Sequence, residues 1–430
     1  MQPTPFLTAW DPRQTLKGSR DPLGSMGLWT HQGRRIIGNL TTVSTQVRDF
    51  TATMLGYHLA ERVRDLAGPG QDVAVFLKWE QLAAYVRAHV LDEGGFRGVE
   101  RTRSRLAAKG PRVTLSARSE HQILGDQKVY GLMGTYTMPG RSSGLLEGEP
   151  LRLTPAAREL VEAEYLPRLA PVAGKRLDGL ARRLAAGEVK VDLDGRDAPL
   201  AEAIGKVLTR KRIPAAERRF YQRHLLYNQD HDTTGGLQGV LAAHMLARGH
   251  TDWEPAGLRQ AATVVAKQGP TGVALAEELE RAAVLESVLA PVGVLFGFLQ
   301  SRNGARTAEA VEELEQVWGR GLGGIDPVAF DALRPTLAEV DPEGAGRWVQ
   351  LAGVLQAGRF AEALRLVLDQ NRAVMQRRGA APWIVVKDGR LEVRYTDAAG
   401  KLLTPEELAG ELRHPYFLPS MQGIADQLRA

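Results

Sequence analysis

The chain has 430 residues and no cysteine, which excludes disulfide bonds and thiolate metal sites and suits a cytoplasmic protein. Its formal net charge of +5, with 24% charged and 43% hydrophobic residues, is typical of a globular protein with roughly two to four domains. The first residues lack a basic segment followed by an apolar run, so we expect neither a signal peptide nor a membrane location.

Residues 1–95 form the first predicted region, which is helical. Apolar residues recur at three- and four-residue steps over 30–64 and again over 73–89. This spacing predicts two helices, each with one buried face. The Gly-Pro-Gly sequence at 68–70 separates them, because proline and glycine interrupt helices.

Residues 96–170 contain a pattern that is typical of winged-helix modules. Helical spacing over 99–108 and 116–132 predicts two helices, and a short apolar hairpin follows with its turn at Gly148–Pro150. A further helix is predicted to begin with Thr154 as N-cap and proline at its first position. Many such modules bind DNA, and many others only hold proteins together.

The remaining chain divides into a basic helical segment at 171–236, a helical domain at 237–378 and a C-terminal region at 379–430. The basic segment includes a short strand at 188–193, and the C-terminal region has a hairpin with an Asp-Gly turn. The apolar stretch 282–299 is interrupted by polar residues and a proline, so we interpret it as a core helix. The predicted fold class is mainly α: a helical multidomain protein with a winged-helix-like module and a small C-terminal β-hairpin unit.

Two groups of basic residues predict contact with a polyanion such as double-stranded DNA. The first lies at the start of the winged-helix pattern, and the second spans 206–223, where seven cations face only Glu217. A few more side chains fall in the segment that would enter the major groove. The alternative is that these cations lie on solvated faces and form ion pairs within the chain. The predicted DNA-binding residues are Arg101, Arg103, Arg105, Arg118, Tyr136, Arg141, Ser142, Lys206, Arg210, Lys211, Arg212, Arg218, Arg219 and Arg223.

Two polar patterns allow a metal-dependent reaction, although simpler interpretations are favoured. Glu188 and Lys190 match half of a metal-dependent nuclease site, with Asp178 as the nearest further carboxylate. The cluster Asp230–Asp232 offers ligands too, but adjacent loop residues point in different directions, so it is better interpreted as a helix-capping loop. No phosphate-binding loop occurs, and we expect neither a cofactor nor a bound metal.

Short motifs spread over most of the chain resemble a family of large uncharacterised bacterial proteins encoded near phage-defence and DNA-modification genes. The motifs are Asp21-Pro-Leu-Gly24, Thr45-Gln-Val-Arg48, Gly144-Leu-Leu146, Leu153-Thr-Pro155, Arg378-Gly-Ala-Ala-Pro-Trp383 and His414-Pro-Tyr-Phe-Leu418. The resemblance implies a context, defence against foreign DNA in a multi-protein system. It provides no catalytic residues that can be carried over to this chain. We therefore expect a non-catalytic DNA-binding subunit of a multi-subunit antiviral defence or DNA-processing complex. The alternatives are a structural protein–protein scaffold, which could self-associate as a homo-oligomer, and a metal-dependent nuclease.

Overall fold

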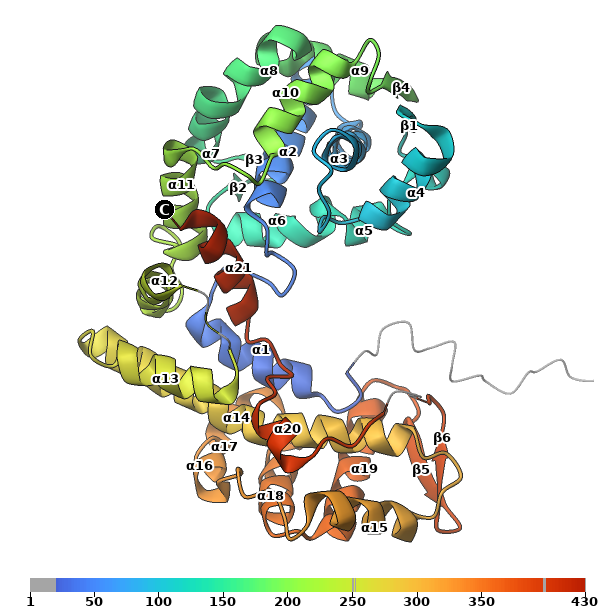
Figure 1. Cartoon of the computed structure of the whole chain (residues 1–430), viewed down its shortest axis with the longest axis vertical. Helices are drawn as coiled ribbons and strands as arrows, with labels where there is room; N and C mark the ends of the chain where they lie inside the picture. The colour runs from blue at the N-terminus through green and yellow to red at the C-terminus, as the bar shows by residue number, and fades with distance from the viewer. Residues whose placement is uncertain (1–20, 250, 252, 397–399, 430) are drawn as a thin grey trace, which may run out of the picture. The chain divides into compact units, whose positions relative to one another are not determined.

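The computed structural model describes residues 21–249, 251, 253–396 and 400–429 (Figure 1). The chain divides into two compact units, unit 1 (Met1–Ile36 and Asp252–Tyr416) and unit 2 (Ile37–Thr251 and Phe417–Ala430). The described part of each unit is mainly helical, which confirms the mainly α prediction. Each unit joins segments from distant parts of the chain, which composition alone does not reveal. The five-region division stays a prediction.

Unit 2 consists of helices around a central pair, with two short antiparallel strand pairs. Its helices are α2 (Val47–Ala67), α3 (Asp72–His89), α4 (Val99–Lys109), α5 (Gln127–Tyr130), α6 (Leu132–Ser142), α7 (Pro155–Leu160), α8 (Leu166–Ala173), α9 (Asp178–Ala185), α10 (Ala198–Leu208), α11 (Ala215–Tyr221), α12 (Leu237–Arg248) and α21 (Leu418–Leu428). Its shorter elements are the 3₁₀ turns η2 (Ser119–His121) and η4 (Lys175–Leu177), the π turns η3 (Val161–Tyr165) and η5 (Gln222–Leu226), and the strands β1 (Arg112–Leu115), β2 (Leu146–Glu147), β3 (Arg152–Leu153) and β4 (Val189–Asp192).

Helices α2 and α3 form the core of unit 2, and α4 to α10 surround them (Figure 1). Every residue from Val47 to Ala60 is buried, so this part of α2 is enclosed on all sides rather than on one face. The two helices approach closely at Gly56, where a Cβ atom would lie 2.6 Å from the Phe76 ring and 3.0 Å from Trp79. A residue without a side chain is therefore required at this crossing.

The strand pairs of unit 2 differ in how far apart their partners lie in sequence. Strands β2 and β3 form a local hairpin in which Leu146 pairs with Leu153. Strand β4 was predicted as a short strand, and it pairs with β1, where Val113 lies opposite Val191. The strand β1 itself was not predicted.

Thr154 caps α7 as predicted. Its hydroxyl oxygen accepts a hydrogen bond from the backbone N–H of Ala157 at 3.3 Å and donates to the carbonyl of Gly144 at 2.8 Å. We expect Thr154→Ala to lower the free energy of unfolding of unit 2 by about 1 kcal/mol, since an N-cap side chain contributes about that much. Chemical denaturation measures the loss, and Thr154→Ser should restore most of it. An alanine variant as stable as the wild type would contradict this role.

Two predicted helices are wrong in their extent. The helix predicted over 30–64 is divided into α1 (Ser25–Ile36) and α2 by an irregular segment with a turn, in which the Thr41 backbone bonds to Ser44. The helix predicted over 116–132 is replaced by a turn, by η2 and by the short α5. There the buried amide of Gln127 donates to Glu80 and to the carbonyl of Leu77, and these tertiary hydrogen bonds outweigh helix propensity.

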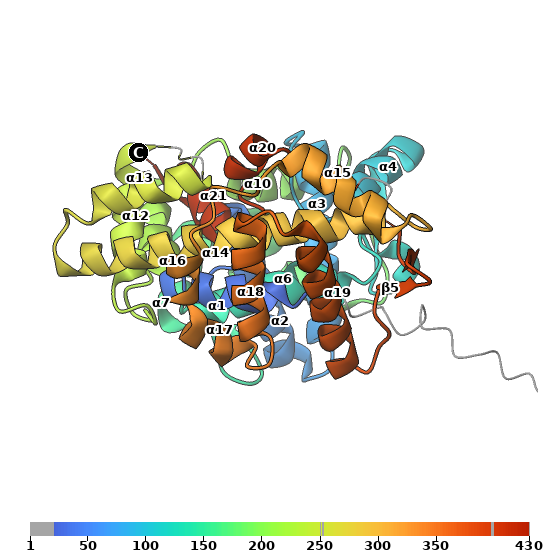
Figure 2. The same ribbon diagram turned by 90° about the horizontal axis from the view of Figure 1, so that it is seen from below.

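Unit 1 is built on the long helix α14, which α18 and α19 cross side by side (Figure 2). Strands β5 and β6 pair antiparallel across Asp388 and Gly389, which both have positive φ. The described elements of unit 1 are α1, α13 (Pro255–Val265), α14 (Pro270–Gln300), α15 (Thr307–Trp318), α16 (Pro327–Asp331), α17 (Arg334–Val340), α18 (Ala345–Gln356), α19 (Phe360–Arg377), β5 (Ile384–Lys387), β6 (Arg390–Val393) and α20 (Pro405–Ala409).

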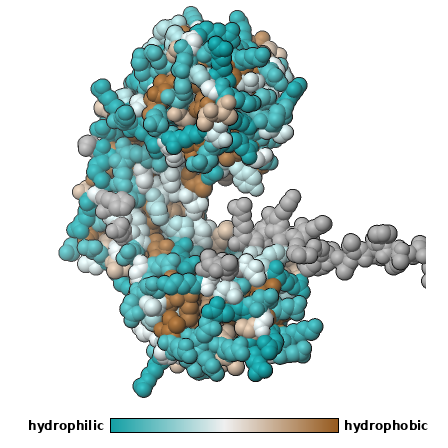
Figure 3. Space-filling model, turned by 45° about the vertical axis from the view of Figure 1, so that its right-hand side comes forward, coloured by the Kyte–Doolittle hydropathy of each residue, from teal (hydrophilic) through white to brown (hydrophobic). Residues whose placement is uncertain are grey.

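Helix α14 is long and apolar enough to cross a membrane by length and composition, but 78% of its most apolar window is buried inside the protein. Its carboxylate Glu286 is 1% exposed and accepts hydrogen bonds from the Tyr416 hydroxyl and the His414 ring, both at 2.9 Å. This burial agrees with the prediction of a core helix. Figure 3 shows a mainly hydrophilic surface on which apolar patches are separate rather than continuous.

Candidate functional site

The loop between α10 and α11 carries part of the predicted basic group, and a buried arginine fixes its backbone. Arg48 of α2 donates from Nε to the carbonyl of Thr209 and from Nη2 to the carbonyl of Arg212, both at 2.8 Å. The backbone N–H of Arg210 donates to Glu93 at 2.9 Å. These bonds hold the inner side of the loop, so that the side chains of Lys211 and Arg212 are left exposed.

Arg48 also forms the most deeply buried ion pair described in unit 2. Its Nη1 lies 2.5 Å from Glu217 of α11, and the two side chains are 1% and 0% exposed. Arg168 approaches the other oxygen of the same carboxylate at 3.5 Å. A buried charge is tolerated only when it is paired and hydrogen-bonded. Glu217 is the single carboxylate in the segment 206–223 that carries the seven predicted cations. It pairs with Arg48 and Arg168 and therefore does not neutralise the exposed cations.

The seven cations of 206–223 divide into two sets. In the first set, Arg210 lies 3.5 Å from the carboxylate of Glu93, and Arg223 donates two hydrogen bonds of 3.0 Å to Asp230. Arg218, the third member, is half-buried. The other four are exposed, and their side chains have no partner among the residues that the structure describes. These four, which we call the free cations, are Lys206, Lys211, Arg212 and Arg219.

The first predicted basic group is engaged within the chain. Arg105 donates to the backbone carbonyls of residues 120–122, and Arg101 donates to one of the same carbonyls at 3.2 Å. Arg118 pairs with Glu188 at 3.0 Å, and Arg103 lies 3.6 Å from Asp92. For this group the alternative of intrachain pairing fits the structure better than an exposed polyanion surface does.

The residues predicted to enter the major groove are not presented together. Tyr136 is 1% exposed, and its hydroxyl donates to Asp49 at 3.1 Å, so its inclusion as a DNA-binding residue is wrong. Burial raises the pKa of this hydroxyl well above its ordinary value, which keeps it a donor. Ser142 is half-buried. Arg141 is exposed, with Glu149 at 3.9 Å.

The charge of the chain is concentrated in unit 2. Its sequence contains 32 lysines and arginines against 25 aspartates and glutamates, a net charge of +7, whereas unit 1 contains 23 against 25. The excess of positive charge therefore lies in the same unit as both of the predicted basic groups. Such an imbalance favours attraction of anions toward unit 2.

The candidate nuclease and metal residues are engaged in other contacts. Glu188 and Asp178 each pair with an arginine, at 3.0 Å to Arg118 and 2.9 Å to Arg62. Asp232 caps the turn before α12 by accepting from the N–H groups of residues 234 and 236. Within the described ranges, no three histidine or carboxylate side chains are grouped closely enough to hold a metal ion. The hydrogen bonds of Asp232 correspond to the favoured capping interpretation.

The residues that position the basic loop, Arg48 and Glu93, were not among the predicted site residues. A signal for Arg48 does exist, because the charged pair Arg48-Asp49 lies between the apolar residues Val47 and Phe50 in the predicted helix. Nothing in the sequence indicates which carboxylate or carbonyls it meets. Comparison with known proteins adds no assignment, since no family model, curated protein or solved structure matches the chain.

Proposed function

We propose that the protein is a non-catalytic DNA-binding subunit of a bacterial defence or DNA-processing complex. In this proposal unit 2 contacts the phosphate backbone of duplex DNA through the four free cations. The observation that carries the proposal is their placement at and beside a fixed loop. Lys211 and Arg212 lie on the loop between α10 and α11, whose backbone Arg48 and Glu93 hold from inside, and Lys206 and Arg219 lie on the two flanking helices. Cations on a fixed backbone lose less conformational entropy when they bind phosphates, so such a loop suits sequence-independent contact.

The winged-helix interpretation of 96–170 is a finer part of the same proposal. Its support is the local order of α6, the β2–β3 hairpin and α7, together with the exposed Arg141 at the end of α6. Because Tyr136 is buried and the α4 arginines are engaged, we assign the main contact to the free cations. The proposed role of this module is secondary.

The test is the salt dependence of binding to a random duplex, measured by fluorescence anisotropy. We expect the variant with all four free cations changed to glutamine to bind more than about tenfold more weakly at low salt. The slope of log K against log salt should fall in magnitude by about 3.6, since each of the four lost phosphate contacts removes about 0.9.

A matched control changes four exposed cations of unit 1 that likewise have no described side-chain partner, with the same loss of charge. They are Lys267, Arg320, Lys387 and Arg394. This control should keep the wild-type slope. Absence of duplex binding at low salt would overturn the proposal in favour of a protein–protein scaffold. An equal loss of duplex affinity in the unit 1 control variant would overturn it as well.

A further inference from the structure

Unit 2 contains a cavity of about 430 Å³ between two helical stretches, each of which includes a π turn. One wall comes from α7 and η3, and the other comes from α11 and η5. Single π turns within helices occur frequently at functional sites. Much of the wall is apolar, with Leu160 and the alanines at 156, 163 and 216.

The inner wall of this cavity includes His224 in a defined tautomer. The residue is 6% exposed, and its Nδ1 lies 3.1 Å from the carbonyl oxygen of Ser143. Because a carbonyl can only accept, Nδ1 must carry the proton, which leaves the lone pair on Nε2. Burial lowers the pKa of the ring, so Nε2 is an acceptor at neutral pH. Phe220 lies against the ring, with centroids 4.4 Å apart.

The carboxylates at the cavity differ in whether they are engaged. Asp230 is held by Arg223, and Glu164 pairs with Arg168 at 3.2 Å. Glu159 is exposed and has no partner among the described residues. The polar groups left to a ligand are therefore the Glu159 carboxylate and the Nε2 of His224, which both accept hydrogen bonds.

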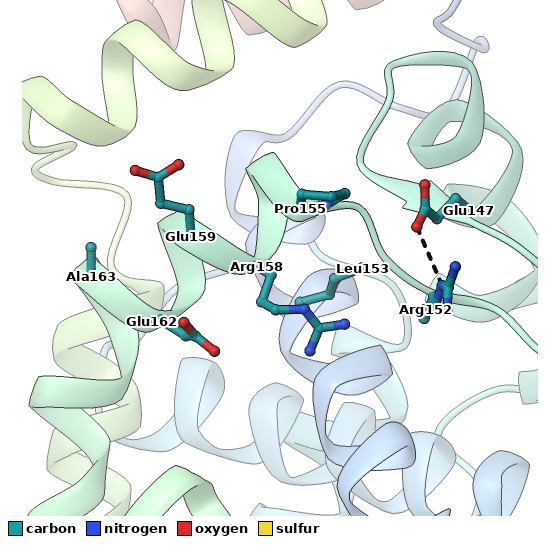
Figure 4. Close-up of a pocket in the computed structure, with 8 residues that line it drawn as sticks. All are labelled: Glu147, Arg152, Leu153, Pro155, Arg158, Glu159, Glu162 and Ala163. Carbon is teal, nitrogen blue, oxygen red and sulfur yellow. Dashed lines mark ion pairs between the residues drawn. The ribbon is translucent and has the colours of Figure 1, made fainter.

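Figure 4 shows the neighbouring cavity of about 660 Å³, to which Glu159 also contributes. In that view Glu159 and Glu162 project from different sides of the α7–η3 helix. Glu162 lines only the neighbouring cavity, is exposed and likewise has no described partner. Glu162 lies about one helical turn from Glu159 and therefore provides a control substitution for Glu159.

We propose that the cavity bounded by Glu159, Phe220 and His224 binds an organic cation, a guanidinium or primary ammonium group on an aliphatic stem. The carboxylate of Glu159 pairs with the charge, and Nε2 of His224 accepts one N–H. The face of the half-buried Phe220 ring attracts the cation, and the leucine and alanine walls cover the stem. The cation comes from a free amine or from an arginine or lysine side chain of a partner protein. This site does not depend on the proposed DNA contact.

The test uses the full-length protein and three probes. Agmatine represents a free amine, Nα-acetyl-arginine N-methylamide represents a partner side chain, and the corresponding citrulline amide is the neutral isostere. Calorimetry should show saturable binding of at least one of the two guanidinium probes and much weaker binding of citrulline. The nitrogen resonance of the His224 Nε2 should shift with the same affinity. Whichever guanidinium probe binds more tightly identifies the source.

Glu159→Gln should lower the affinity for the tighter-binding probe by about tenfold or more, because it removes a charge-assisted hydrogen bond. Phe220→Leu should weaken it as well. Glu162→Gln, with the same change in charge, should bind this probe with an affinity within about twofold of the wild-type value. The proposal is overturned if citrulline binds equally, if Glu162→Gln is as damaging as Glu159→Gln, or if neither guanidinium probe binds saturably.

Discussion

Replacing Arg48 with methionine is expected to lower the free energy of unfolding of unit 2 by about 3–5 kcal/mol. The substitution leaves the carboxylate of Glu217, which is 0% exposed, with the 3.5 Å contact to Arg168 as its one remaining ion pair among the described residues. It also removes the donors to the carbonyls of Thr209 and Arg212. Amide hydrogen exchange of α2 and α10 measures the loss in unit 2 separately from unit 1.

A double variant separates the cost of an unpaired charge from the loss of packing. Arg48→Met combined with Glu217→Leu should be more stable than Arg48→Met alone, since it leaves no buried charge without its partner. If the proposed DNA contact holds, the single variant should also weaken duplex binding without changing the salt slope. Equal stabilities of the single and double variants would contradict the buried-charge explanation.

The stability of unit 2 is also expected to depend on the protonation of Glu80. This carboxylate of α3 is 3% exposed and accepts from the Leu132 backbone at 2.7 Å and from Gln127 at 2.8 Å. Desolvation by burial is the main cause that raises its pKa from 4.5 to about 7. The folded state therefore retains a proton that the unfolded chain releases above pH 4.5.

Because the pKa is higher in the folded state, protonation of Glu80 stabilises unit 2 fully below pH 4.5, and this stabilisation is lost as pH rises through 7. Between pH 5 and 8 the wild type should lose about 2–3 kcal/mol relative to Glu80→Gln, which cannot titrate. Only this difference in slope is diagnostic, since glutamine also loses one accepted hydrogen bond. The free energy of unfolding of unit 2 is measured against pH by hydrogen exchange in α3. If it changes in parallel in the two proteins, Glu80 does not titrate in this range.

Features that depend on local chemistry could be predicted from the sequence. The helix over 73–89 follows from its apolar spacing, and the start of α7 follows from threonine before proline. The segment 116–132 could not be predicted correctly, because Gln81 and Gln127 stabilise a turn there through side-chain bonds to distant backbone atoms. Periodicity describes burial on a face and carries no information about such bonds.

The candidate site was predictable only in part for the same reason. Charge along the chain indicated the basic group at 206–223, but whether a cation is available depends on its tertiary neighbours. Arg210 and Lys211 are adjacent in sequence, yet one turns to Glu93 and the other is exposed. The cavity beside His224 combines residues from segments about sixty positions apart, which no local pattern brings together.

The last helix has a consequence for how the protein is made. The larger part of unit 1, residues 252–416, is inserted between α12 and α21, yet α21 packs against α12 and η5 in unit 2. The side chain of Gln427 accepts from the N–H of Val47 at 3.0 Å and donates to the carbonyl of Thr45 at 2.8 Å. During synthesis, residues 37–251 of unit 2 therefore leave the ribosome before residues 252–416 of unit 1. The surfaces of α12 and η5 that α21 covers stay uncovered until that part of unit 1 has been translated.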